Sequence, residues 1–155
     1  MSSQKTRILM VCLGNICRSP LAESILRSKI DPTKVEVDSA GTSNYHIGDA
    51  PDKRAISTGK RYGLDLSSLR GRQFEVADFD RFDYIYVMDR SNYEDVLSLA
   101  RNEKDKEKVS LLLDKIYPGE SIDVPDPYFG VGDEHFPKVY ELLEKACEKI
   151  AQEVS

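Results

Sequence analysis

Four short runs of apolar residues along the chain predict buried β-strands. They cover Arg7–Val11, Val35–Val37, Phe82–Met88 and Val109–Leu113. The first and third runs are almost unbroken series of aliphatic and aromatic residues, which is typical of parallel strands covered on both faces. The second run is shorter and leads into a turn-rich segment that contains Ser39 and Gly41.

Helical spacing of apolar residues fills much of the chain between and after these strands. The predicted helices are Pro20–Ile30, Pro51–Tyr62, a stretch that begins at Ser91 and ends near Ala100, and His135–Val154. Pro20 suits a first helical turn because its missing N–H needs no partner there. Gly63 is a stop signal for the second helix, and Ser91 with Glu94 has the pattern of a capping box.

The remaining segments have no sustained period. Leu66–Arg81 predicts only short helical turns, and Arg101–Lys108 predicts a charged, solvated loop. Residues 114–134 are rich in Pro, Gly and Asp, and a loop of that length in a compact domain is usually functional or disordered. Strands that alternate with helices predict one α/β domain over residues 1–155, a four-stranded parallel sheet in the order 2-1-3-4 with helices on both faces.

Composition excludes several classes of function. The chain has 155 residues, and its 27 acidic and 22 basic side chains give a net charge of -5, which disfavours broad binding to nucleic acid or to an anionic membrane. No stretch is long enough to span a bilayer, and the N-terminus leads into the first strand rather than into a signal peptide. Three irregularly spaced cysteines form neither a disulfide framework nor a zinc site, so we expect a reducing, cytoplasmic location.

Candidate chemistry begins directly after the first strand, in the run Cys12-Leu13-Gly14-Asn15-Ile16-Cys17-Arg18-Ser19-Pro20. A strand, a short loop and a helix N-terminus form an anion site, because backbone N–H groups converge there. Cys12 lies at its rim, and Arg18 has the planar fork that binds phosphate oxygens. These surroundings favour a thiolate, which Ser19 can also stabilise. Asp89 follows the third strand, so it is expected in the same crevice.

Cleavage of a phosphate ester also needs a proton for the leaving oxygen. Asp126 is the best candidate, because the prolines on either side of it stiffen the long aperiodic segment. The following Tyr128 and Phe129 would form an aromatic wall for a planar substrate. Two histidines, His46 and His135, are rival proton donors, and both have the sequence context of surface residues.

These motifs resemble the low-molecular-weight protein tyrosine phosphatases, and the resemblance covers essentially the whole chain. It is carried by the segments Cys12–Pro20, Asp38–Thr42, Phe82–Tyr84, Met88–Asp89 and Asp126–Tyr128. The resemblance implies hydrolysis of phosphotyrosine in a protein or peptide, with inorganic phosphate as product and inhibitor. It also implies a monomer or weak dimer, and it implies neither a metal nor an organic cofactor.

The resemblance further implies a role for each matching residue. Cys12 is the nucleophile that forms a phosphocysteine, Arg18 binds the phosphate, and Ser19 stabilises the thiolate when it leaves. Asp126 is the general acid and then the general base. The phosphate-binding loop comprises Leu13, Gly14, Asn15, Ile16, Cys17 and Arg18. Asn15 and Ser39 support that loop, and the substrate cleft is lined by Leu13, Tyr45, His46, Tyr128 and Phe129.

Some positions depart from the family pattern or stay open. Ser68 is the nearest match to a histidine that supports the loop in many members, which leaves the support of Asn15 open. His46 stands where an acidic residue is often found, and Phe129 replaces a second tyrosine. By resemblance, Cys17 forms a reversible disulfide with Cys12 that protects it from overoxidation, with a small packed residue as the alternative.

Three other functions fit the same loop. Arsenate reductase needs further redox cysteines, and Cys147 in the last helix is a poor substitute for them. A protein-arginine phosphatase has Thr at the position of Ile16, and an apolar β-branched side chain suits an aryl phosphate better. A non-enzymatic phosphocarrier would need Cys12 but no general acid, so Asp126 argues against it.

Overall fold

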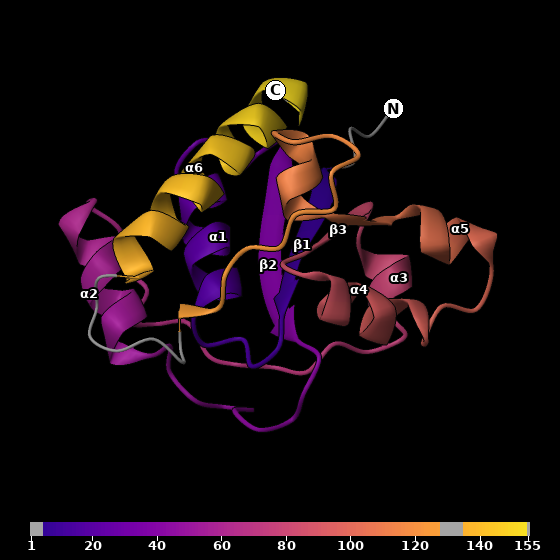
Figure 1. The fold of residues 1–155 in the computed structure, drawn as a ribbon, viewed down its shortest axis with the longest axis horizontal. Helices are drawn as coiled ribbons and strands as arrows, with labels where there is room; N and C mark the ends of the chain where they lie inside the picture. The colour runs from indigo at the N-terminus through magenta and orange to yellow at the C-terminus, as the bar shows by residue number, and fades with distance from the viewer. Residues whose placement is uncertain (1–4, 128–134, 155) are drawn as a thin grey trace.

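The four strands form one parallel sheet in the computed structural model, which describes residues 5–127 and 135–154 (Figure 1). The strands are β1 (Thr6–Cys12), β2 (Val35–Gly41), β3 (Tyr84–Val87) and β4 (Val109–Leu111). Their order is β2-β1-β3-β4, and each neighbouring pair is parallel. The predicted α/β architecture and strand order are therefore confirmed.

Helices cover both faces of the sheet (Figure 1). One layer contains α1 (Arg18–Arg27), α2 (Lys53–Arg61) and α6 (His135–Val154), and the other contains α3 (Asp78–Arg81), α4 (Arg90–Leu97) and α5 (Glu103–Glu107). Alternate residues of β1 supply both cores, because successive strand side chains point to opposite faces. Ile8 and Met10 pack in the core that includes residues of α1 and α6, whereas Leu9 and Val11 pack with Phe79.

The topology places the end of β1 in the middle of the sheet, between β2 and β3. The chain passes from β1 through α1 to β2 on one side and later returns to β3 on the other side of β1. Strand order reverses at this point, and crevices at such reversals are the usual ligand sites of parallel sheets. The loop after Cys12 lies at this reversal.

Several element boundaries differ from the sequence prediction. α1 begins at Arg18 rather than at Pro20, which is possible because none of the first four helical N–H groups needs an intrahelical partner. β2 continues past Val37 to Gly41, since backbone pairing with β1 persists where the side chains turn polar. The last helix, α6, has the predicted bounds.

Two predictions in the second helical layer were wrong. The N-cap of α4 is Asp89, whose side chain accepts a hydrogen bond from the backbone N–H of Asn92, so Ser91 and Glu94 form no capping box. The segment predicted as a charged loop contains α5, which Asn102 caps. This short helix is stabilised by Asp105, a 3% exposed residue whose carboxylate accepts hydrogen bonds from Arg101.

The segment between β4 and α6 begins with a 3-10 turn, η1 (Leu112–Lys115), and is otherwise irregular up to Pro127. Val124, a buried residue in this segment, donates its N–H to the carbonyl oxygen of Met88 at 2.7 Å. The irregular segment thus packs against the end of β3. No helix in the described ranges is long and apolar enough to cross a membrane.

Candidate active site

Residues 13–17 form a loop between the end of β1 and the start of α1. Cys12 is the last residue of β1 and is 3% exposed. Because α1 begins at Arg18, the first N–H groups of that helix lie beside the loop without intrahelical partners. The helix terminus also carries partial positive charge, so the loop favours an anion next to the thiol.

Two groups form hydrogen bonds with the Cys12 sulfur. The backbone N–H of Asn15 donates to Sγ at 3.3 Å, and the Ser19 hydroxyl lies 3.0 Å from the same atom. Hydrogen bonds of this kind favour a negatively charged sulfur. Asn15 has a φ of 59°, in the left-handed region that Asn tolerates better than most residues.

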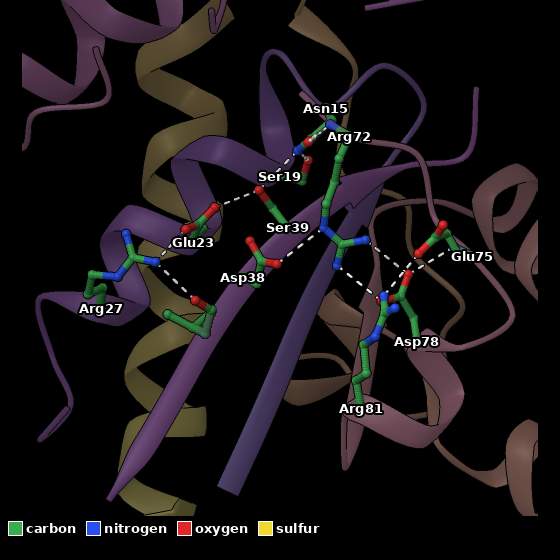
Figure 2. A network of polar contacts seen from close by, with 11 residues as sticks. Asn15, Ser19, Glu23, Arg27, Asp38, Ser39, Arg72, Glu75, Asp78 and Arg81 are labelled. Atoms are coloured by element: carbon green, nitrogen blue, oxygen red, sulfur yellow. Dashed lines mark hydrogen bonds and ion pairs between the residues drawn. The ribbon is translucent and has the colours of Figure 1, made fainter. Parts of the chain in front are cut away.

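The Asn15 side chain is fixed by three partners (Figure 2). Its Nδ2 donates to Ser19 Oγ at 2.8 Å and to Ser39 Oγ at 3.0 Å. Its Oδ1 accepts a hydrogen bond from the backbone N–H of Arg72 at 3.0 Å. The left-handed residue of the loop is therefore held by β2, by α1 and by a segment that lies 57 residues away in the sequence.

A buried carboxylate continues this network behind Ser39 (Figure 2). The Ser39 hydroxyl donates to Glu23 at 2.6 Å, and Glu23 is 3% exposed. Arg27, one turn further along α1, donates to Glu23 and also to the carbonyl oxygen of Val37 at 2.9 Å. Burial raises the pKa of Glu23 above its ordinary value, although the Ser39 hydrogen bond and the Arg27 charge oppose that shift.

The guanidinium of Arg72 is clamped on the other side of the loop (Figure 2). Its Nε donates to Asp38 at 3.2 Å, and its two terminal nitrogens donate to Asp78 at 3.0 and 3.2 Å. Asp78 is fully buried and also accepts hydrogen bonds from the Glu75 backbone and from Arg81. This clamp fixes the side chain of the residue whose N–H holds Asn15.

Arg18 is buried and is oriented by groups from distant parts of the chain. Its Nη1 donates to Asp89 at 2.8 Å and to the carbonyl oxygen of Val124 at 2.9 Å, and its Nη2 lies 3.5 Å from Asp126. Burial lowers the pKa of Arg18, but the neighbouring groups, Cys12 first among them, outweigh burial, and the net shift is upward. The guanidinium therefore stays charged beside the thiol.

One cavity of about 230 Å³ lies over this loop. Its lining residues come from the loop, from the segment after β2 and from the irregular segment before α6: Cys12, Leu13, Gly14, Ile16, Cys17, Arg18, Tyr45, His46 and Asp126. The thiol, the guanidinium and the carboxylate thus open into the same space. Most of the predicted site residues come together here.

The cleft wall formed by Tyr45 and His46 stands against the loop. Tyr45 is 74% exposed and lines the cavity. The His46 Nδ1 lies 3.1 Å from Asp49, and an ideal Cβ added to Gly14 would lie 3.0 Å from the His46 ring. The imidazole therefore packs on the loop backbone.

Cys17 also lines the cavity. Burial, with the Asp52 carboxylate second, raises the pKa of Cys17 well above its ordinary value. The backbone around it is anchored because the Asp52 N–H donates to the carbonyl oxygen of Ile16 at 2.8 Å. Cys17 thus remains a neutral thiol in the same cavity as Cys12.

Some predicted site residues lie apart from the cavity or outside the part of the chain that the structure describes. Tyr128 and Phe129 lie outside the described residues. Ser68 is exposed, and the three side-chain hydrogen bonds of Asn15 go to other residues. His135 is exposed at the start of α6 and is not among the lining residues of the cavity.

Sequence reasoning missed two residues and one contact of this arrangement. Glu23 lies four positions after Ser19, so helical spacing could have indicated a carboxylate on the same face of α1 as the loop. Arg72 acts through its backbone N–H, for which the sequence holds no signal. Asp89 lies in the crevice as expected, but its contact with Arg18 spans 71 residues of sequence and has no local pattern.

Within residues 5–127 and 135–154, no group of three or more His, Cys, Asp or Glu side chains is placed to hold a metal ion. The parallel sheet has a cysteine at the end of a central strand, followed by a loop and helix N-terminus that suit an anion and by a buried arginine. This arrangement is typical of proteins that bind phosphate beside a reactive cysteine.

Comparison with known proteins gives the family. The model of the low molecular weight phosphotyrosine protein phosphatase family matches residues 7–155. The human low molecular weight phosphotyrosine protein phosphatase is 40% identical in an alignment of 152 residues, with 95% of each chain covered. The chain belongs to the low molecular weight phosphotyrosine protein phosphatase family.

Solved structures agree with this assignment. A protein tyrosine phosphatase of Entamoeba histolytica, with Hepes in its active site, is 39% identical and has a TM-score of 0.86 over 94% of each chain. Wzb of Vibrio vulnificus in complex with benzylphosphonate is 30% identical, with a TM-score of 0.85 over 97% of this chain and 99% of that one. A Drosophila arginine phosphatase is 34% identical, with a TM-score of 0.84 over 94% of this chain and 96% of that one.

Proposed function

We propose that this chain hydrolyses phosphotyrosine in proteins or peptides through a phosphocysteine on Cys12. The observation that carries the proposal is the shared cavity into which Cys12, Arg18 and Asp126 open. A phosphatase of this type needs a nucleophile, an oxyanion clamp and a proton donor, and these three side chains supply one each.

In the first step, the Cys12 thiolate attacks phosphorus while the bond from phosphorus to the tyrosine oxygen breaks. Asp126 gives its proton to that oxygen, so the leaving group departs as a neutral phenol. In the second step, Asp126 removes a proton from water, the water oxygen attacks phosphorus, and the bond from phosphorus to sulfur breaks. Ser19, 3.0 Å from the sulfur, stabilises the departing thiolate.

Arg18 holds the equatorial oxygens of the phosphoryl group, where charge spreads in the transition state. Its Nη1 is occupied by Asp89 and the Val124 carbonyl, whereas its Nη2 lies 3.5 Å from Asp126, which lines the cavity. The loop residues 13–17 bind the same oxygens through their N–H groups, supported by Asn15 and Ser39. Inorganic phosphate, the product, binds the same cradle and inhibits.

The cleft suits an aromatic phosphate. Leu13, Ile16 and Tyr45 give it apolar and aromatic walls, against which a planar ring can pack. Wzb of Vibrio vulnificus binds benzylphosphonate, an aryl-methyl phosphonate, and its likeness to this chain supports the same substrate class here. Tyr128 and Phe129, which follow Asp126 and Pro127 in the sequence, stay predicted residues of the substrate cleft. The three free thiols, one of them the nucleophile, favour a reducing compartment such as the cytoplasm.

Phosphoarginine is the second candidate substrate, because an arginine phosphatase of Drosophila shares the fold at 34% identity. Ile16 discriminates between the two, since its apolar branched side chain lines the cavity and favours an aryl group over a guanidinium. A phosphocarrier would leave Asp126 without a function in the cavity. Arsenate reduction would need a further thiol, and Cys147 is fully buried with its pKa raised to about 12 by burial.

The experiment that tests the proposal is a comparison of four substrates with the purified protein. Release of phosphate from phosphotyrosine, phosphoserine and phosphoarginine peptides is measured beside reduction of arsenate. We expect hydrolysis of phosphotyrosine with a kcat/KM well above that of the other substrates. A preference for phosphoarginine, or turnover of arsenate alone, would replace the proposal with the corresponding alternative.

A further inference from the structure

Of the three residues that follow β3, Met88 and Arg90 contact the segment that carries Asp126, and Asp89 is linked to it through Arg18. The Met88 carbonyl oxygen accepts the Val124 N–H at 2.7 Å. Asp89 accepts a hydrogen bond from Arg18, which itself donates to the Val124 carbonyl. Arg90 donates its backbone N–H to Asp123 at 3.0 Å. The junction between β3 and α4 thus holds both the phosphate-binding arginine and the segment of the proposed general acid.

The carboxylate of Asp123 makes the outermost of these contacts. Its Oδ1 accepts from the Arg90 N–H and, at 3.2 Å, from the Arg90 Nε, while its Oδ2 lies 3.4 Å from Nη2. Arg90 is the first residue of α4, so its N–H has no partner within that helix. A carboxylate at this position also interacts favourably with the positive end of the helix.

We infer that Asp123 is a positioning residue for the general acid Asp126, an inference that rests on the proposed function. Asp123 and Val124 are anchored to the β3–α4 junction, and Asp126 lies only two positions after Val124. Proline rings fix φ at Pro125 and Pro127 and restrict the residue before each of them. The short rigid path transmits the position of the Asp123 anchor to the Asp126 carboxylate.

The consequence for catalysis is specific to proton transfer. A misplaced carboxylate weakens protonation of the leaving oxygen, and geometry errors of about 1 Å cost up to about 10²-fold in rate. The nucleophile loop is held by other contacts, namely those of Asn15 and Ser39, and Arg18 keeps its hydrogen bond to Asp89 when the Asp123 anchor is lost. Loss of the anchor therefore slows substrates that need a strong acid and spares phosphate binding.

Asp123 accepts from the backbone N–H and from the guanidinium of Arg90, and substitutions can separate these two contacts. R90A removes the guanidinium but keeps the backbone N–H. R90P removes both, and proline is well tolerated at the first position of a helix. The residue before it, Asp89, already has an extended backbone with φ -147° and ψ 174°, which a following proline requires. R90P therefore deletes the donor without a conflict with the helix start.

The test measures kcat/KM for a series of aryl phosphates whose leaving phenols decrease in acidity, together with the inhibition constant of inorganic phosphate. For phosphotyrosine we expect D123A and R90P to lose between about 10-fold and 10²-fold, with a smaller loss for the most acidic phenols. R90A loses less than about fivefold, because exposed ion pairs contribute little. D123N retains an acceptor for the N–H and lies between D123A and wild type.

Matched controls separate positioning from general damage. E103A deletes an exposed ion pair with Lys106 on α5 and should leave every rate unchanged. The phosphate inhibition constant should stay near the wild-type value in all variants. Equal losses across all leaving groups, a weakened phosphate cradle, or an R90P variant no slower than R90A would overturn the inference.

A second measurement keeps the anchor testable if the proposed function fails. If the wild-type protein hydrolyses no phosphotyrosine, the proposed function is wrong. The anchoring of the segment by Asp123 is then measured by the hydrogen-exchange rate of the Val124 amide. We expect that amide to exchange faster in D123A and R90P than in wild type or E103A. Unchanged exchange together with unchanged leaving-group dependence would show that Asp123 has no positioning role.

Discussion

Ser39 donates a hydrogen bond to the buried carboxylate of Glu23 at 2.6 Å. The same hydroxyl accepts from Asn15, so a charge inside α1 orients the one loop residue with a left-handed backbone. A buried carboxylate is costly unless it is paired, and here Ser39 and Arg27 supply the partners. These hydrogen bonds offset the cost of burying Glu23. Through Ser39 they also hold Asn15 in place before phosphate binds.

Substitution of Glu23 should therefore weaken both the fold and the loop. E23A removes the acceptor of Ser39, and we expect it to lower the free energy of unfolding by about 1–3 kcal/mol, as for other buried hydrogen-bond partners. E23Q keeps an acceptor oxygen and should lose less. Urea unfolding measures both, and the phosphate inhibition constant should rise more in E23A than in E23Q. Equal stability of wild type and E23A would contradict this role.

The same residue predicts a pH dependence of stability. Burial raises the pKa of Glu23 in the folded state above its ordinary value of 4.5. Between pH 4.5 and the raised pKa of Glu23, the folded protein therefore binds more protons than the unfolded chain. Wild type thus gains stability relative to E23Q as the pH falls through that window. Unfolding of both proteins between neutral pH and pH 4 measures this. An opposite slope would mean that the partners of Glu23 dominate.

Removal of the nucleophile should separate binding from turnover. C12S keeps the loop, Arg18 and the helix terminus but replaces the thiol with a hydroxyl that is a far weaker nucleophile at neutral pH. We expect no measurable hydrolysis of phosphotyrosine, with phosphate and vanadate still bound. Calorimetry measures the binding and phosphate release the turnover. Retained turnover in C12S would show that Cys12 is not the nucleophile.

Loss of the general acid should depend on the leaving group. D126N cannot give a proton to the tyrosine oxygen, so kcat/KM for phosphotyrosine should fall by about 10²–10⁴-fold. Aryl esters with good leaving groups need less protonation and should lose less. A series of aryl phosphates measures this difference. An equal loss on every ester would assign Asp126 to the positioning of Arg18, which lies 3.5 Å away.

The sequence predicted the sheet and the cavity-lining loop because both depend on contiguous residues. Apolar runs give the strands, and Cys12 to Arg18 form one local structure. The prediction failed where a side chain acts across the fold. Asp89 caps α4 and binds Arg18 at once, so the local pattern of Ser91 and Glu94 gave a wrong cap.

The error at α5 has a related cause. Residues 101–108 look like a solvated loop because most of them are charged. In the fold, Arg101 binds Asp105 inside the segment and Asp80 outside it, and Asp105 is buried by these contacts. The Asn102 cap and the pairing of Arg101 with Asp105 hold this polar segment as a helix, and no periodicity of apolar residues records these side-chain contacts.

Mild oxidation should test the chemical difference between the two cysteines of the cavity. Peroxide converts the Cys12 thiolate to a sulfenic acid, which condenses with the Cys17 thiol and releases water. Mass spectrometry should find a Cys12–Cys17 disulfide that a thiol reductant reverses. Cys147 is fully buried, with its pKa raised to about 12, and should stay a thiol as an internal control.

The C17S variant decides whether the second thiol protects the first. Without Cys17, the sulfenic acid on Cys12 has no neighbouring thiol to condense with, so further peroxide should carry it to the irreversible sulfinic acid. Phosphatase activity should then return after reduction in wild type but not in C17S, and the same spectra should show the mass of the two added oxygens on Cys12. A sulfinic acid on Cys12 in wild type, with Cys17 unchanged, would exclude protection and leave Cys17 as a small packed residue of the loop.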